Sequence, residues 1–112
     1  MSFRSLYRHG FVRVAACTTV TMLADPAANA RAILAMAGDL HQKAVAVAVF
    51  PELGLSGYSI SDLLQQGTLL DAVEAAVDTI IAGSAELMPL LLIGAPLRHD
   101  GALYNCALAI QR

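Results

Sequence analysis

Residues 45–58, VAVAVFPELGLSGY, decide the fold of this chain. The first six of them are apolar at every position, which is typical of a strand buried on both faces of a parallel sheet. Pro51 ends the strand because it has no backbone N–H, and the two glycines that follow predict a loop. Glu52 comes directly after the strand end, where open α/β sheets place their ligand and catalytic sites.

The residues before this stretch predict a βαβ unit. Residues 11–17, FVRVAAC, are short and mostly apolar and predict a strand. Residues 26–43 predict a helix, with Asp25 as its N-cap and proline at its first position. Its apolar residues recur at helical spacing: Ala30, Ile33, Ala37, Leu40 and Ala44. A strand, a helix and a strand within about 40 residues form a unit whose crossover is right-handed.

Two helices are predicted after the loop. The tetrad Ser59-Ile60-Ser61-Asp62 has the character of a capping box and predicts a short helix that ends at about Gln65. Thr68, with Asp71 three residues later, predicts the start of a longer helix. The apolar residues of the longer helix also recur at helical spacing: Leu70, Val73, Val77, Ile80 and Ile81.

The last part of the chain predicts two strands. Residues 90–96, LLLIGAP, form another continuous apolar run, and residues 103–110 predict a strand that returns antiparallel after a tight turn at Asp100-Gly101. The expected fold is therefore α/β, in the order strand, helix, strand, short helix, helix, strand, strand. It amounts to one sheet with covering helices, and its last strand is expected to leave an unprotected apolar edge.

The composition agrees with an incomplete fold. Apolar residues make up 57% of the 112 residues and charged residues 14%, whereas about 25% is usual for charged residues in a soluble domain. A small domain has much surface to cover, so a chain with few charges is buried against something or is one piece of a larger fold. We expect residues 1–112 to be the first portion of a larger domain.

Several function classes are excluded by charge and pattern. Seven Lys and Arg against nine Asp and Glu give a net charge of −2, without the basic stripe that nucleic-acid binding requires. The longest nearly apolar run, residues 87–97, is shorter than the ~20 residues of a membrane-spanning helix. Two distant cysteines give no disulfide framework, and the three histidines lack metal-ligand spacing. We expect no nucleic-acid partner, no membrane and no metal site.

A secretory signal is the alternative interpretation of the N-terminus. Residues 14–24 are fairly apolar and follow three arginines, and Ala28-Asn29-Ala30 resembles a cleavage site. Three threonines interrupt the apolar run, however, and Asp25-Pro26 favours a helix start. We therefore favour a cytoplasmic protein with a solvated N-terminal arm.

Glu52 is the candidate catalytic residue. A carboxylate beside an apolar strand end is expected to lose part of its hydration, which suits a general base. Gly54 and Gly57 would let the loop fold closely over the site. Position alone leaves an alternative, in which Glu52 caps the next turn or pairs with an arginine.

Several segments resemble known families. Residues 50–53, FPEL, and 55–58, LSGY, resemble the first signature of the carbon–nitrogen hydrolase (nitrilase) superfamily, and Gly94-Ala95-Pro96 with Tyr104-Asn105 resembles its next hairpin. Residues 7–15, YRHGFVRVA, resemble the start of the glutamine-dependent NAD synthetases, whose first domain is a nitrilase-type glutaminase. The resemblance covers essentially the whole chain, but only the first part of that domain.

This resemblance implies a partial nitrilase-like α-β-β-α sandwich and a Glu-Lys-Cys triad. In the triad, Glu activates the Cys thiol, the thiolate attacks the glutamine carboxamide and forms a thioester as ammonia leaves, and Lys stabilises the charge on the carbonyl oxygen. Only Glu52 matches a triad member. Lys43, Cys17 and Cys106 occupy no matching position, and we read both cysteines as small buried hydrophobes. Tyr58, expected one turn past Glu52 at the mouth of the amide pocket, is the candidate substrate contact, and the alternative is that its ring only packs against the fold.

The resemblance also implies partners and cofactors. Glutamine would be the substrate of the whole domain, and the full-length protein would be a homo-oligomer. ATP and Mg²⁺ would act only in a synthetase domain that amidates deamido-NAD and is absent here, so no cofactor is expected in this chain. Without the family Lys and Cys, the chain alone is expected to be inactive. Two alternatives stay open: a fragment of another nitrilase-superfamily amidase, and a non-catalytic remnant that self-associates.

Overall fold

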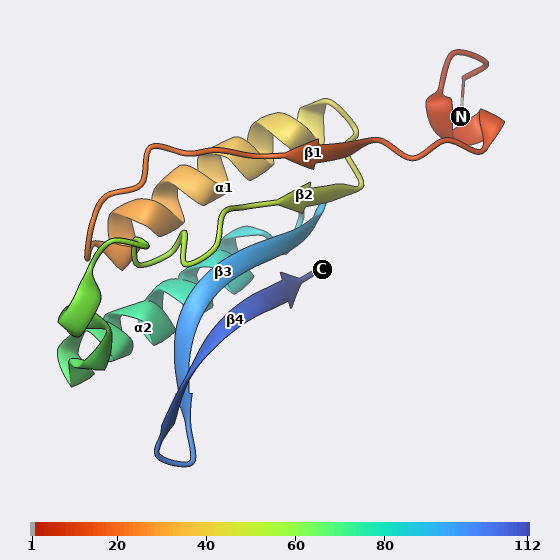
Figure 1. Ribbon diagram of the computed structural model, residues 1–112. Coiled ribbons are helices and arrows are strands. Elements are labelled where there is room, and N and C mark those ends of the chain that lie inside the picture. The colour runs from red at the N-terminus through yellow and green to blue at the C-terminus, as the bar shows by residue number, and fades with distance from the viewer. Residues whose placement is uncertain (1) are drawn as a thin grey trace.

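The computed structural model describes residues 2–112, which form a four-stranded sheet and two long helices (Figure 1). The elements are η1 (Leu6–His9), β1 (Val14–Ala16), α1 (Pro26–Gln42), β2 (Val47–Val49), η2 (Ser61–Gln65), α2 (Gly67–Gly83), β3 (Leu90–His99) and β4 (Ala102–Ile110). The strands stand in the order β1-β2-β3-β4. β1, β2 and β3 are parallel, and β4 pairs antiparallel with β3. The predicted α/β order is confirmed, and η1 precedes it.

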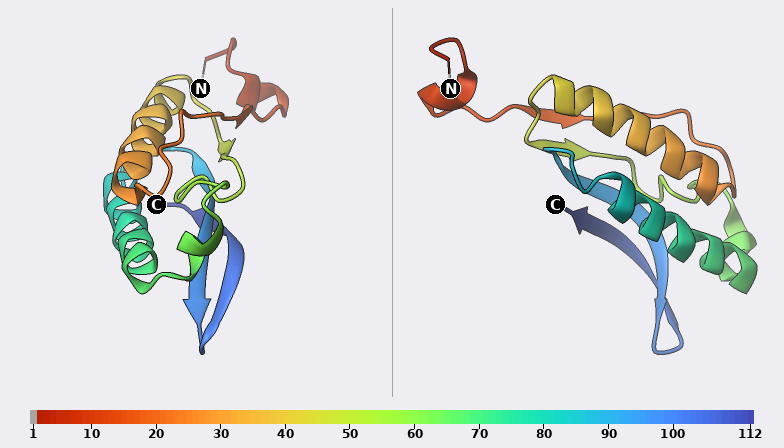
Figure 2. Two further views of the ribbon diagram at one scale, coloured as in Figure 1. Left: turned by 60° about the vertical axis from the view of Figure 1, so that its left-hand side comes forward. Right: turned by 180° about the vertical axis from the view of Figure 1, so that it is seen from behind.

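Both long helices cover the same face of the sheet (Figure 2). Their apolar stripes pack against alternate strand residues to form the core, which includes Ile33, Ala37, Val73, Ile80, Leu91 and Ile93. On β2, Ala48 faces this core and is fully buried, whereas Val49 is 45% exposed. The prediction that this strand is buried on both faces is therefore wrong for residues 2–112. A continuous apolar run shows that both faces suit burial, but it does not show which segment covers each face.

Of the three predicted N-caps, one is present in the structure. Asp25 caps α1 as predicted, and its side chain accepts a hydrogen bond from the Ala28 N–H at 3.1 Å. Both other predicted helices are present, and η2 ends at Gln65 as predicted. Their predicted caps are wrong, because η2 follows Ile60 and α2 follows Gln66, and neither N-cap residue makes a side-chain bond. Ile60, Leu69 and Leu70 are buried around these starts. No side-chain hydrogen bond therefore caps either of these two helices.

The strands begin and end at other residues than predicted, because pairing with neighbouring strands sets their bounds. β1 and β2 are shorter than predicted, since only three residues of each pair in parallel register. β3 is longer, because its pairing with β4 continues from Leu91 opposite Ile110 to His99 opposite Ala102. The turn at Asp100 and Gly101 has φ of 48° and 78°, which confirms the predicted tight turn. As predicted, β4 forms an edge of the sheet.

Within residues 2–112, neither long helix combines the length and the apolar character that a bilayer crossing requires.

Candidate active site

Glu52 lies in the loop that follows β2, at the carboxyl end of the parallel strands, where the sequence placed it. This loop lies directly on β3. A Cβ atom added to Gly94 would lie 2.5 Å from the backbone N of Leu53 and 2.5 Å from the carbonyl oxygen of Pro51. The Leu55 N–H donates a hydrogen bond to the Gly94 carbonyl at 3.0 Å. The missing side chain of Gly94 therefore lets the loop that carries Glu52 sit against the sheet.

A buried asparagine on α1 holds the far end of the same loop. The side chain of Asn29 donates to the carbonyl oxygens of Met22 at 2.8 Å and Leu55 at 2.9 Å, and it accepts from the Met22 N–H at 2.7 Å. Asn29 is only 2% exposed. A structural role for Asn29 is not predicted from the sequence. Its place between Pro26 and Ile33, on the buried stripe of the helix, is the signal that could have identified it.

Replacing Asn29 by leucine is expected to lower the free energy of unfolding by about 3 kcal/mol, because polar backbone groups of Met22 and Leu55 lose their partners. Urea denaturation of the chain measures this change. Gln42→Leu is the matched control, since Gln42 is exposed on the same helix and its replacement should change stability by at most about 0.5 kcal/mol. Equal stability of Asn29→Leu and wild type would show that these bonds do not secure the loop.

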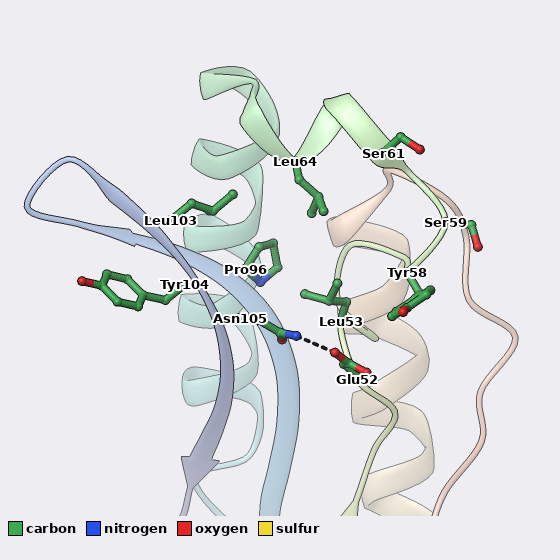
Figure 3. Close-up of a pocket in the computed structure, with 10 residues that line it drawn as sticks. All are labelled: Glu52, Leu53, Tyr58, Ser59, Ser61, Leu64, Pro96, Leu103, Tyr104 and Asn105. Atoms are coloured by element: carbon green, nitrogen blue, oxygen red, sulfur yellow. Dashed lines mark hydrogen bonds between the residues drawn. The ribbon is translucent and has the colours of Figure 1, made fainter.

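A side chain on β4 holds the carboxylate of Glu52 in place. The side-chain Nδ2 of Asn105 donates a hydrogen bond to Oε1 of Glu52 at 2.5 Å (Figure 3). Neither alternative for Glu52, a turn cap or an arginine pair, appears among the side-chain contacts of residues 2–112. The carboxylate is exposed to solvent, so the expected loss of hydration is not seen. The cavities beside Glu52 are open to solvent, which explains the exposure.

A cavity of about 670 Å³ opens beside Glu52. It is lined by Glu52, Leu53, Tyr58, Ser59, Ser61, Leu64, Pro96, Leu103, Tyr104 and Asn105. Its volume lies within the range of small-molecule sites, and a mixed apolar and polar lining is common in them. Tyr58, the predicted substrate contact, lies on its wall near Glu52 and is 67% exposed (Figure 3). Asn105, Tyr104, Ser59 and Ser61 line the same cavity. The sequence placed them only in a hairpin motif or a capping box, and predicted no part in the site for any of them.

The cysteines and the lysine lie away from this arrangement. Cys17 is buried in the core, and burial raises the pKa of its thiol, which keeps it in the unreactive protonated form. Cys106 is partly buried and neighbours Asn105 on β4, so its side chain lies on the opposite face of the sheet. Lys43 follows α1, at the start of β2 rather than at its end. Residues 2–112 contain no group of three His, Cys, Asp or Glu side chains that could hold a metal ion.

Comparison with known proteins gives consistent matches. A family model described as carbon-nitrogen hydrolase matches residues 13–112. The chain is 57% identical over all 112 residues to the glutamine-dependent NAD(+) synthetase of Mycobacterium tuberculosis (strain ATCC 25618 / H37Rv) and 54% identical to that of Mycobacterium leprae (strain TN). It spans 16% of the length of each.

A solved structure supports the fold. The crystal structure of a glutamine-dependent NAD(+) synthetase from Cytophaga hutchinsonii superposes with a TM-score of 0.80 at 22% identity, over 89% of this chain and 17% of that one. This similarity confirms the expected nitrilase-like fold, of which the chain forms a part.

Proposed function

The chain belongs to the carbon–nitrogen hydrolase family, and from this premise we propose that it is the first part of a glutaminase domain that supplies ammonia to a glutamine-dependent NAD synthetase. The observation that carries the proposal is Glu52, presented at the end of a parallel strand beside a cavity of about 670 Å³. The 57% identity to a protein named as that synthetase supports the choice of glutamine over other amides. The chain spans only 16% of that relative, so the activity of the whole enzyme is part of the proposal.

Glu52 acts as the general base of this site. Its carboxylate takes the proton of a cysteine thiol supplied by another part of the domain, and the thiolate attacks the carboxamide carbon of glutamine. The C–N bond then breaks, and the leaving nitrogen takes the proton from Glu52 and departs as ammonia. Glu52 next removes a proton from water, whose oxygen attacks the thioester. Glutamate leaves and the cysteine recovers its proton, so the net reaction converts glutamine and water to glutamate and ammonia.

Tyr58 contacts the substrate in this proposal. Its ring lies on the cavity wall beside the loop of Glu52 (Figure 3). An exposed aromatic ring at the mouth of a cavity offers apolar surface to the methylene groups of glutamine and a hydroxyl to its polar end. Tyr58 therefore helps to orient the carboxamide toward Glu52.

ATP and Mg²⁺ act elsewhere in the complete enzyme. Residues 2–112 contain no acidic or histidine cluster suited to a metal ion, and the only lysine of the chain, Lys43, does not belong to a phosphate-binding glycine loop. Residues 2–112 therefore do not fit ATP or Mg²⁺, and neither ATP nor Mg²⁺ takes part in the steps described for Glu52. The complete enzyme is proposed to be a cytoplasmic homo-oligomer.

The first test uses the chain on its own. Purified residues 1–112 are expected to release no ammonia from glutamine above background, because Glu52 alone provides neither the nucleophile nor the cation for the carbonyl oxygen. A polypeptide extended through the family lysine and cysteine is expected to release ammonia. A coupled ammonia assay on both polypeptides measures the difference. Ammonia release by the 112-residue chain itself would contradict the proposal.

A further inference from the structure

We propose that Asn105 is a positioning residue for Glu52. Its side-chain amide donates to Oε1 of Glu52 at 2.5 Å, which fixes the carboxylate in the cavity and leaves Oε2 to accept the thiol proton. This inference rests on the proposed function, and it concerns a residue that contacts the base rather than the reacting atoms.

The backbone brings the two side chains together from segments 53 residues apart in sequence. Asn105 pairs with Pro96 across the β3–β4 hairpin, and Ala107 pairs with Gly94 two residues away. Because strand side chains alternate between faces, Asn105 lies on the same face as Gly94, and this is the face on which the loop of Glu52 rests. The hairpin register and the close approach at Gly94 thus set the distance between the amide and the carboxylate.

An amide suits this task for a chemical reason. A hydrogen bond donated to the charged form of a carboxylate favours that form, and a base must be ionised before it can accept a proton. The amide carries no charge and does not itself take up the proton. An arginine at the same place would stabilise the ionised form more strongly, and so would weaken the carboxylate as a base.

Stability alone does not account for the contact. Both Glu52 and Asn105 are exposed, and water competes for hydrogen bonds between exposed groups, so such bonds contribute little to folding. The bond also lies on the wall of the cavity that contains the candidate base. These two observations favour a role in orienting Glu52.

The test compares Asn105→Asp and Asn105→Ala in the complete enzyme. Asn105→Asp preserves shape but replaces the donor by a second carboxylate next to Glu52. Gln111→Glu is the matched control, because it makes the same amide-to-carboxylate change at an exposed position after β4 ends. The measurements are kcat/KM for glutamine as a function of pH, the rate with free ammonia as nitrogen donor, and the melting temperature.

Asn105→Asp is expected to lower kcat/KM for glutamine by up to about 100-fold and to move the acidic limb of the pH profile upward, because a second carboxylate beside Glu52 disfavours its ionised form. Asn105→Ala should shift the limb less, since water can replace the amide. The ammonia-driven rate, the melting temperature and the Gln111→Glu enzyme should remain close to wild type.

Two results would overturn the inference. Wild-type glutamine kinetics in both Asn105 variants, with Glu52→Gln inactive, would remove the role of Asn105 and leave the proposed function standing. Equal loss of the glutamine and ammonia reactions, together with a lower melting temperature, would show a purely structural role. Full glutaminase activity in Glu52→Gln would instead refute the proposed function itself, so the two failures are distinguishable.

Discussion

Glu52→Gln in the complete enzyme is expected to abolish glutamine-dependent amidation and to preserve the reaction driven by free ammonia. A glutamine side chain at position 52 has nearly the volume of the glutamate side chain and can still accept the hydrogen bond from Asn105 through its carbonyl oxygen. The loop should therefore keep its place. It cannot accept a proton, however, and a general base contributes about 10²- to 10⁴-fold to a rate. Rates of NAD formation with glutamine and with an ammonium salt, measured on the same preparation, give the two activities separately.

Glu86→Gln provides the matched control for this substitution. Glu86 is exposed in the connection between α2 and β3, away from the carboxyl ends of the strands, and its replacement should leave both rates unchanged. Loss of the glutamine and ammonia reactions to the same extent in Glu52→Gln would mean that Glu52 supports the structure rather than the chemistry.

The parts of this site that the sequence predicts depend on local patterns. The apolar run that ends at Pro51 places Glu52 correctly because strand length and strand termination are properties of neighbouring residues. Asp25 is also a correct prediction, since an N-cap bonds to the backbone three residues later. Local capping patterns at Ser59 and Thr68 predict the wrong caps, because Ile60 and Gln66 occupy the N-cap positions and make no side-chain hydrogen bond.

The parts that the sequence does not predict depend on contacts between distant segments. The bond between Asn105 and Glu52 exists only because one particular hairpin register places Asn105 opposite Pro96. A shift of one residue in that register would turn Asn105 to the other face. Asn29 is similar, since its partner Leu55 lies in a loop 26 residues away. The exposure of Val49 likewise depends on which segments cover each face of the sheet.

Replacement of Gly94 is the second substitution with a large expected effect. Gly94→Ala is expected to displace the loop that carries Glu52, because the new Cβ would lie 2.5 Å from backbone atoms of Leu53 and Pro51 and 2.9 Å from the carbonyl carbon of Glu52. Overpacking of this kind costs about 1–3 kcal/mol. Misplacement of a catalytic group by about 1 Å can cost about 100-fold in rate. Urea denaturation of the chain and kcat/KM for glutamine in the complete enzyme measure the two effects.

Gly38→Ala makes the same chemical change, but the expected effect on stability is the opposite one. Gly38 lies inside α1, and a Cβ there meets no atom within 4 Å, so alanine should stabilise the helix by about 0.5–1 kcal/mol. Both variants add one methyl group. If Gly94→Ala lowers stability while Gly38→Ala raises it, the loss is due to the close approach at Gly94 and not to a general effect of removing glycine. Wild-type stability and wild-type glutamine turnover in Gly94→Ala would show that the loop does not rest on β3. Glu52 would then be placed by some other contact.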